Sequence, residues 1–149
     1  MKRFNVYFLF LPFLSLVLAT GSGQCVYRTL SVTRVHGALV GTLVDPDGRP
    51  IPNADVELKG DEHVASAATN ADGEFSIQAP PGGYEIHANA RGFALGIARV
   101  DVGSDLIEML RPAHLWMILD VGILLDHCTF TTTSRRELEK AIQEHKKRD

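Results

Sequence analysis

The sequence lacks the patterns that mark most catalytic and nucleic-acid-binding proteins. It contains no G-x-S-x-G nucleophile elbow and no phosphate-binding loop. No two of its six histidines have the short spacing of a zinc site, and its acidic residues do not follow the EF-hand pattern. The formal net charge of −3 provides no basic face for backbone phosphates. These absences argue against a hydrolase of the common kinds, a zinc protein and a nucleic-acid partner.

Long apolar runs are also scarce, and the one present stands at the N-terminus. Lys2 and Arg3 precede it, and small residues follow it from Ala19 onward. The run is shorter than the roughly 20 apolar residues that span a bilayer, and Pro12 interrupts it. We therefore expect a secretory signal peptide over residues 1–21, with a retained membrane anchor as the alternative. The product would be periplasmic, envelope-associated or secreted, with no spanning segment after cleavage.

Cysteine is rare, since the chain has only Cys25 and Cys128. Export to an oxidising compartment would permit one disulfide between them. A reactive thiol is the alternative, and the disulfide is the favoured interpretation.

What the chain does contain is a series of short segments that alternate apolar and polar residues. Turn residues separate them every 8 to 12 positions, a pattern typical of a β-sandwich with about seven strands. Residues 25–32 could lie along a sheet edge, and the strand at 35–44 is apolar on both faces, which favours a central position. The other expected strands are residues 54–59, 64–69, 74–78, 84–90, 94–102 and 106–110.

The turns between these strands are rich in Asp, Asn, Gly and Pro. Asp45 can accept hydrogen bonds from following backbone amides, Gly48 supplies a positive φ, and Pro50 delays strand pairing. Carboxylate and amide oxygens at one end of a sandwich could also bind calcium. Turn formation alone accounts for them, so the sequence predicts no metal and no cofactor.

Five motifs in order identify a family resemblance, and the last of them is I-x-M-L-R-P-A at residues 107–113. The first four are G-T-L-V-D-x-D-G-x-P-I-x-x-A-x-V, then T-N-x-D-G-x-F-x-I, then P-P-G-x-Y, then R-G-F. Together they resemble the carboxypeptidase regulatory-like domain, which implies a transthyretin-like (prealbumin-like) sandwich over residues 35–113 that serves as an accessory module. The resemblance implies no catalytic residue, and it implies structural roles for Asp45, Gly48, Pro50, Ala54, Thr69, Gly73, Phe75, Pro81, Gly82 and Tyr84.

Residues 114–149 depart from this resemblance. Residues 114–125 indicate an added strand or a buried apolar segment, followed by a polar linker. A helix is expected from Ser134 to Lys147, because Ser134 and Glu137 match a capping box and Leu138 begins a narrow apolar stripe.

Two functions from different classes follow. The first is an exported, non-catalytic module that binds a protein or a carbohydrate. The second is a small metalloenzyme, because the segment from Arg111 to Trp116 is similar to the R-P-A-H-I-H segment of intradiol ring-cleaving dioxygenases, whose iron takes two Tyr and two His. In that alternative His114 would act with Tyr27 or Tyr84. Trp116 stands where the second histidine is expected, so the first function is favoured.

Overall fold

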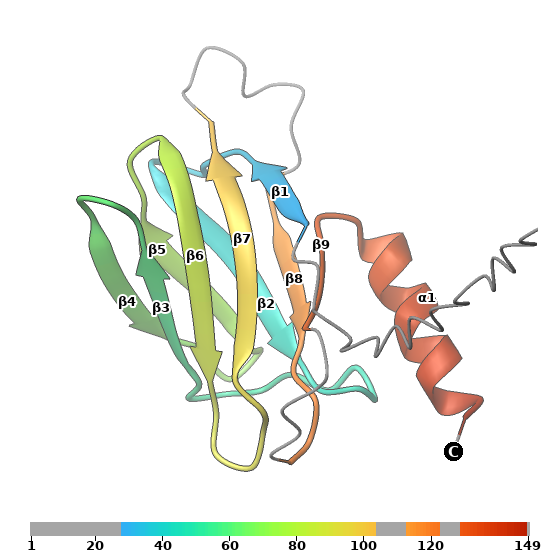
Figure 1. Cartoon of the computed structure of the whole chain (residues 1–149). Coiled ribbons are helices and arrows are strands. Elements are labelled where there is room, and N and C mark those ends of the chain that lie inside the picture. The colour runs from blue at the N-terminus through green and yellow to red at the C-terminus, as the bar shows by residue number, and fades with distance from the viewer. Residues whose placement is uncertain (1–27, 104–112, 123–128, 149) are drawn as a thin grey trace, which may run out of the picture.

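Two β-sheets pack face to face in the computed structural model of the chain, and one helix flanks them (Figure 1). The structure describes residues 28–103, 113–122 and 129–148. The five-stranded sheet has the order β1 (Thr29–Val32), β7 (Gly96–Val102), β6 (Gly82–Asn89), β3 (Asp55–Lys59) and β4 (Val64–Ala68). The four-stranded sheet has the order β5 (Glu74–Gln78), β2 (Ala38–Val44), β8 (Leu115–Ile118) and β9 (Phe130–Thr132). The predicted all-β sandwich is confirmed, with nine strands in the described residues instead of about seven.

The core lies between the sheets because alternate side chains of each strand point inward. In β3, Val56 and Leu58 are fully buried while their neighbours face water. The strands β5 and β6 follow the same alternation. The largest fully buried side chains are Leu39, Leu43, Leu58, Ile86, Leu115, Met117, Leu119, Val32, Val56, Val100 and Val102.

Strand β2 is central, as expected, and it begins later than the sequence suggested. His36 and Gly37 both have positive φ, and the backbones of Val35 and Ala38 exchange two hydrogen bonds across them. This tight turn occupies the first residues of the expected strand, so β2 starts at Ala38. The segment at the N-terminal side forms β1, which lies at a sheet edge and runs parallel to β7.

The part of the chain after residue 113 completes the second sheet. Strand β8 runs parallel to β2, with Thr42 beside Trp116, and β9 pairs with β8. The boundary placed at residue 113 stays a prediction. The signal peptide, the possible Cys25–Cys128 disulfide, Tyr27 and the strand expected at 106–110 all lie outside the described residues.

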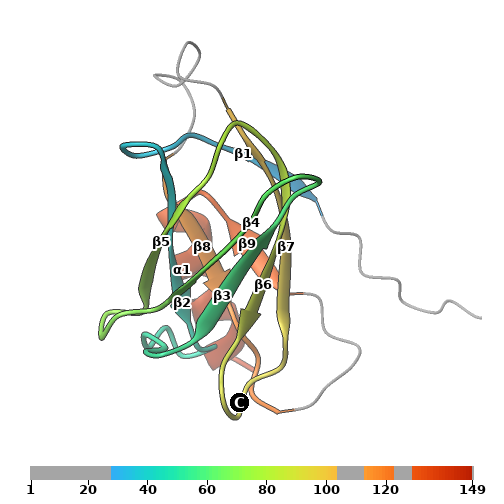
Figure 2. The same ribbon diagram turned by 90° about the vertical axis from the view of Figure 1, so that its left-hand side faces the viewer.

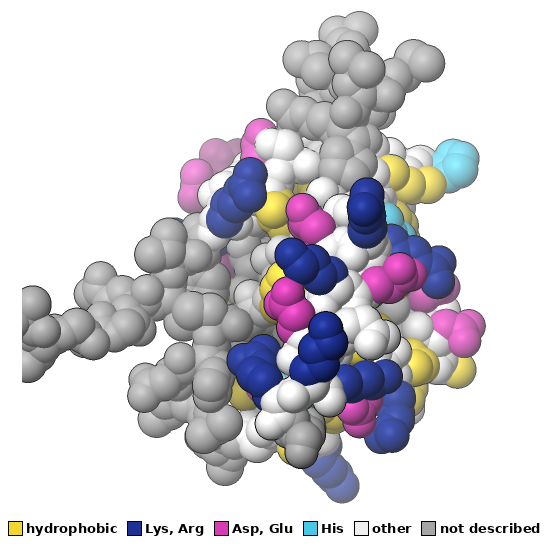
Figure 3. Space-filling model, turned by 90° about the vertical axis from the view of Figure 1, so that its right-hand side faces the viewer, with side chains coloured by type: hydrophobic (Ala, Val, Ile, Leu, Met, Phe, Trp, Pro, Cys, Tyr) yellow, Lys and Arg dark blue, Asp and Glu magenta, His cyan; other side chains and the backbone are white. Residues whose placement is uncertain are grey.

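The helix α1 (Arg135–Lys146) packs on the outer face of the four-stranded sheet. Leu138 is buried against Val44 and Ile118, and Trp116 and Ile142 border this small second cluster. Figure 3 shows Lys and Arg side chains interspersed with Asp and Glu on this side of the molecule. The helix is therefore amphipathic, with one narrow apolar stripe facing the sheet.

The N-terminus of α1 is capped through two residues. Ser134 is the N-cap, and its hydroxyl accepts a hydrogen bond from the Glu137 backbone N–H. The Ser134 N–H donates to the Thr132 hydroxyl at 3.0 Å, and that hydroxyl donates to the Glu137 carboxylate at 2.5 Å. Thr132 thus stands between the two partners of the expected capping box.

Candidate functional site

The turns at the lower end of the sandwich in Figure 1 use their polar side chains to hold the backbone. Asp45 Oδ1 accepts hydrogen bonds from the N–H groups of Asp47 and Arg49, at 2.9 and 2.8 Å. Asn70 Oδ1 accepts from Asp72 and Glu74 in the same way, at 2.9 Å each. Within the described ranges, no group of three or more His, Cys, Asp or Glu could hold a metal ion.

Glycine and proline shape these same turns. Gly48 and Gly73 have φ of 84° and 73°, values that disfavour other residues. A Cβ on Gly73 would lie 2.5 Å from the Leu43 carbonyl oxygen, so the close approach of two chain segments also requires glycine there. Pro50 lies in the turn before β3, and Ala54, Thr69 and Phe75 are buried. These residues serve backbone geometry and packing.

His114 and Tyr84, two candidates for the iron site, are held in different sheets. His114 precedes β8, beside the outer-facing Thr42, whose Oγ1 lies 2.8 Å from the imidazole Nε2. Its ring contacts that of Trp116, with centroids 4.4 Å apart. Burial lowers the pKa of His114, and Glu74 offsets this in part. Tyr84 lies in β6 with its side chain in the core between the sheets. The two side chains therefore do not share a site.

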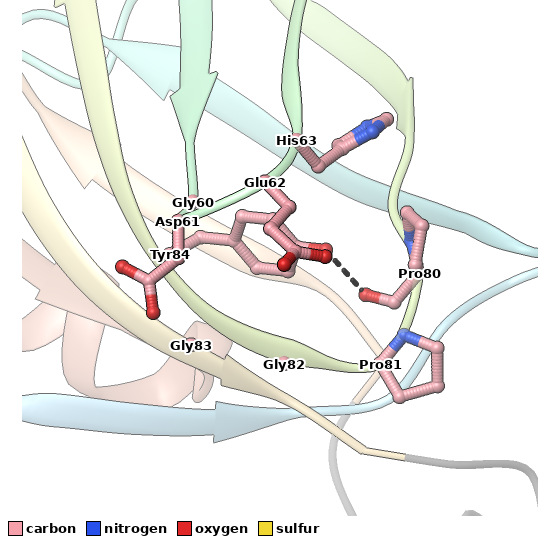
Figure 4. Close-up of a pocket in the computed structure, with 9 residues that line it drawn as sticks. All are labelled: Gly60, Asp61, Glu62, His63, Pro80, Pro81, Gly82, Gly83 and Tyr84. Carbon is pink, nitrogen blue, oxygen red and sulfur yellow. Dashed lines mark hydrogen bonds between the residues drawn. The ribbon is translucent and has the colours of Figure 1, made fainter.

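A pocket of about 470 Å³ opens at the upper end of the sandwich. The β3–β4 turn forms one wall, with Asp61, Glu62 and His63, and the β5–β6 loop forms the other. Figure 4 shows the Tyr84 ring between these two walls, with Pro80 and Pro81 opposite the acidic residues. The backbone of Gly82 and Gly83 completes the lining.

Hydrogen bonds from two aromatic side chains fix the walls of this pocket. The Tyr84 hydroxyl donates to the Pro80 carbonyl oxygen at 2.7 Å, the contact drawn in Figure 4. His63 Nε2 donates to the Gln78 carbonyl oxygen at 3.0 Å. The rings of His63 and Tyr84 meet edge to face, with centroids 6.1 Å apart. The pocket therefore has a preformed shape.

Burial keeps the Tyr84 phenol protonated. It raises the pKa of Tyr84, and the charge of Arg34 lowers that pKa by a smaller amount. Gly60 packs on the ring, because a Cβ there would lie 2.7 Å from Tyr84 Cε1. The phenol is thus committed to positioning Pro80, and the groups available to a ligand are the carboxylates of Asp61 and Glu62.

Sequence reasoning missed this pocket. The interval from Gly60 to His63 looks like an ordinary polar turn, and Pro81 and Gly82 look like another. About twenty residues separate them, and no local pattern indicates that they face each other. The one available signal was Tyr84, an aromatic residue directly after the P-P-G-G run.

Sequence comparisons find one family model and several carboxypeptidases. Residues 38–108 match the sequence model of the carboxypeptidase regulatory-like domain. Carboxypeptidase Z of Gallus gallus is 32% identical over 88 residues, which cover 55% of this chain and 13% of that protein. Carboxypeptidase Z of Homo sapiens is 35% identical over 91 residues, 61% of this chain and 14% of that protein. Carboxypeptidase M of Mus musculus is 33% identical over 61 residues, 41% of this chain and 14% of that protein.

Two solved structures show more distant likenesses. Klebsiella pneumoniae 5-hydroxyisourate hydrolase has a TM-score of 0.46 and 20% identity, and the match covers 64% of this chain and 96% of the hydrolase. Catechol 1,2-dioxygenase from Acinetobacter sp. ADP1 has a TM-score of 0.38 and 13% identity, covering 68% of this chain and 61% of the dioxygenase.

The chain spans only 13% to 14% of the length of these carboxypeptidases. The similarity lies where the structure has its sandwich, and it includes the turns described above. The chain therefore carries a carboxypeptidase regulatory-like domain over residues 38–108, which confirms the resemblance of its sequence motifs.

Proposed function

We propose that the protein is an exported, non-catalytic binding module, and that its partner, a protein or a carbohydrate, binds at the upper-end pocket. The observation that carries this proposal is the pair of carboxylates on Asp61 and Glu62. Both side chains are exposed beside a preformed wall of prolines and glycines. Such a site suits a basic side chain of a protein or the hydroxyls of a sugar.

Several other exposed carboxylates form ion pairs, whereas Asp55 and Asp72 are single carboxylates without one in the described segments. Asp47 pairs with Arg49, Glu57 with Lys59, and Glu139 with Arg135. Asp61 and Glu62 form no ion pair with any residue that the structure describes. Two unpaired carboxylates on one turn repel each other, so a cationic or hydrogen-bonding ligand would be attracted there.

The location and the partner class rest on the sequence. The N-terminal run has the features of a signal peptide, so we place the protein in the periplasm, in the cell envelope or outside the cell. Loss of Lys2 and Arg3 with that segment makes the remainder more acidic, which disfavours nucleic acid. No helix in the described part of the chain is long and apolar enough to cross a membrane.

A titration followed by NMR tests the site. The ¹⁵N-labelled protein is titrated with a peptide rich in Lys and Arg and, separately, with a panel of oligosaccharides. We expect amide shifts at Glu62, Gly82 and Gly83, and their loss in Asp61→Asn/Glu62→Gln. The control Asp55→Asn/Asp72→Asn removes two exposed carboxylates elsewhere and should bind normally.

Two results would contradict the proposal. Shifts confined to the lower-end turns would move the site away from the pocket, and no shifts with either probe would rule out a binding site there.

Metal analysis of protein purified without chelators addresses the catalytic alternative. Stoichiometric iron would overturn the non-catalytic function, whatever the titration shows.

A further inference from the structure

Strand β4 forms an unprotected edge of the five-stranded sheet. It makes the left-hand margin of the molecule in Figure 1, and Figure 2 faces this margin. Its sequence, VASAA, has no charge, no proline and no glycine, and Val64 is 65% exposed. Strand β5 forms an edge of the four-stranded sheet, and unlike β4 it carries a charged residue, Glu74. Natural edge strands are usually protected by charge, proline or a bulge, so β4 is an exception.

Alternate residues of β4 direct their backbone N–H and C=O groups away from the sheet. The Gly60 N–H donates to the His63 carbonyl oxygen at 2.8 Å, and the Thr69 N–H donates to that of Ala54 at 2.9 Å. In an antiparallel pair, alternate residues direct both backbone groups to the same neighbour. The odd-numbered residues therefore bond to β3, and Val64, Ser66 and Ala68 direct their N–H and C=O groups away from the sheet.

We propose that β4 pairs with β4 of a second copy of this chain, antiparallel and centred on Ser66. This register sets Ser66 opposite itself, and Val64 opposite Ala68 in both directions. All three residues then form hydrogen-bonded pairs, in which each pair exchanges two bonds. The larger Val64 side chain meets the smaller Ala68 side chain, so no crowding arises on the outer face. The symmetry is that of a closed two-fold dimer. The proposal does not depend on the proposed function.

The charges on β3 neither favour nor oppose this arrangement, because three strand spacings separate the two β3 strands across the two-fold axis. Asp55 lies beside Ala68, and Lys59 lies beside Val64. Across the two-fold axis, Lys59 of one copy therefore lies in the same row as Asp55 of the second copy. Glu57 shares the row of Ser66, so two like charges face each other, but three strand spacings of about 4.8 Å separate them. This exceeds the screening length of about 8 Å at physiological salt.

Sedimentation equilibrium on protein expressed from the full chain tests the dimer. We expect a reversible monomer–dimer equilibrium, and a dissociation constant at least about tenfold weaker in Ser66→Lys, because two lysines would then face each other. The control is Ser76→Lys, which introduces the same charge at an exposed serine of edge strand β5. Its dissociation constant should match that of the wild type.

Cross-linking tests the register independently of any loss of stability. Under mild oxidation, Ser66→Cys should give a disulfide that joins residue 66 of two copies, identified by mass spectrometry of the linked peptides. Ser76→Cys should not link to itself. A wild-type protein that stays monomeric up to about 1 mM would overturn the proposal. A dimer unaffected by Ser66→Lys, or one without the 66–66 link, would overturn it equally.

Discussion

The Thr69 hydroxyl donates a hydrogen bond to the Ile51 carbonyl oxygen at 2.7 Å and accepts one from the Ala54 N–H at 2.9 Å. Thr69 is only 3% exposed, so these backbone groups have no ready substitute from water. One side chain therefore ties the end of β4 to the turn that leads into β3. It closes the lower end of the sandwich.

Replacing Thr69 with valine should destabilise the protein markedly. Valine keeps the shape but leaves the Ile51 carbonyl oxygen and the Ala54 N–H buried and unpaired, which costs about 2 kcal/mol or more. Chemical denaturation of Thr69→Val against the wild type measures the change in unfolding free energy.

Thr33 offers a matched control. It is also buried, at 5% exposed, but its hydroxyl has no partner among the described residues. Thr33→Val should therefore be neutral or slightly stabilising. Equal losses in the two variants would show that the hydrogen bonds of Thr69 do not determine its contribution.

Gly41 should be intolerant of a single added methyl group. A Cβ there would lie 2.5 Å from the Phe75 ring and 2.7 Å from the Leu115 carbonyl oxygen, and the latter cannot move without disturbing the β2–β8 pairing. Overpacking of this kind costs about 1–3 kcal/mol, so Gly41→Ala should lower the unfolding free energy by that amount. Gly83→Ala is the control, since nothing lies within 4 Å of its added Cβ. Similar behaviour of both variants would contradict the close packing of Phe75 on β2.

Local sequence patterns predicted the elements that depend on neighbouring residues. The alternation of Val56 and Leu58 with polar residues fixed the inward face of β3, and Ser134 marked the start of the helix. Asp45 was predicted to stabilise its turn, because its side chain reaches amides only two and four residues away, and Asn70 makes the same two contacts in its own turn. Such contacts are encoded within a short window of sequence.

Relationships between distant residues could not be predicted in the same way. The parallel pairing of β8 with β2 joins residues more than seventy positions apart, and nothing in the apolar run around Trp116 specifies its partner. The upper-end pocket likewise needs Glu62 and Pro81 to face each other across two loops. Chain topology determines both arrangements.

The stability of the protein should depend on the protonation of His114. Burial lowers the folded-state pKa of His114 below its ordinary value of 6.5, so the unfolded chain binds a proton first as the pH falls. The stability that depends on a neutral His114 is fully present above pH 6.5 and is lost as the pH falls through the lowered pKa. The pKa of Glu85 is lowered chiefly by its hydrogen bond to His87. Protonation of Glu85 therefore affects stability only below pH 4.5, its ordinary pKa. The two contributions therefore separate on the pH scale.

Unfolding measured at about pH 7.5 and about pH 5.5 isolates the histidine. His114→Gln keeps a polar group beside Thr42 and should show a smaller loss of stability between the two pH values than the wild type. His36→Asn, at an exposed turn position with positive φ, should retain the wild-type loss. An unchanged loss in His114→Gln would show that other groups cause the pH dependence.

The attachment of α1 should depend on Leu138, the only helix residue that is buried. Leu138→Ala removes its contact with Val44 and Ile118 and should cost about 2 kcal/mol, near the lower limit for a buried leucine because the cluster is small. Trp116 is the sole tryptophan and lies beside this cluster, with the Arg135 guanidinium 6.0 Å from its ring. Loosening of the helix should therefore shift tryptophan emission to longer wavelength under native conditions.

Gln143→Ala, an exposed change on the same helix, should leave emission and stability unchanged. If Leu138→Ala behaves like Gln143→Ala, the helix does not hold to the sheet through its apolar stripe.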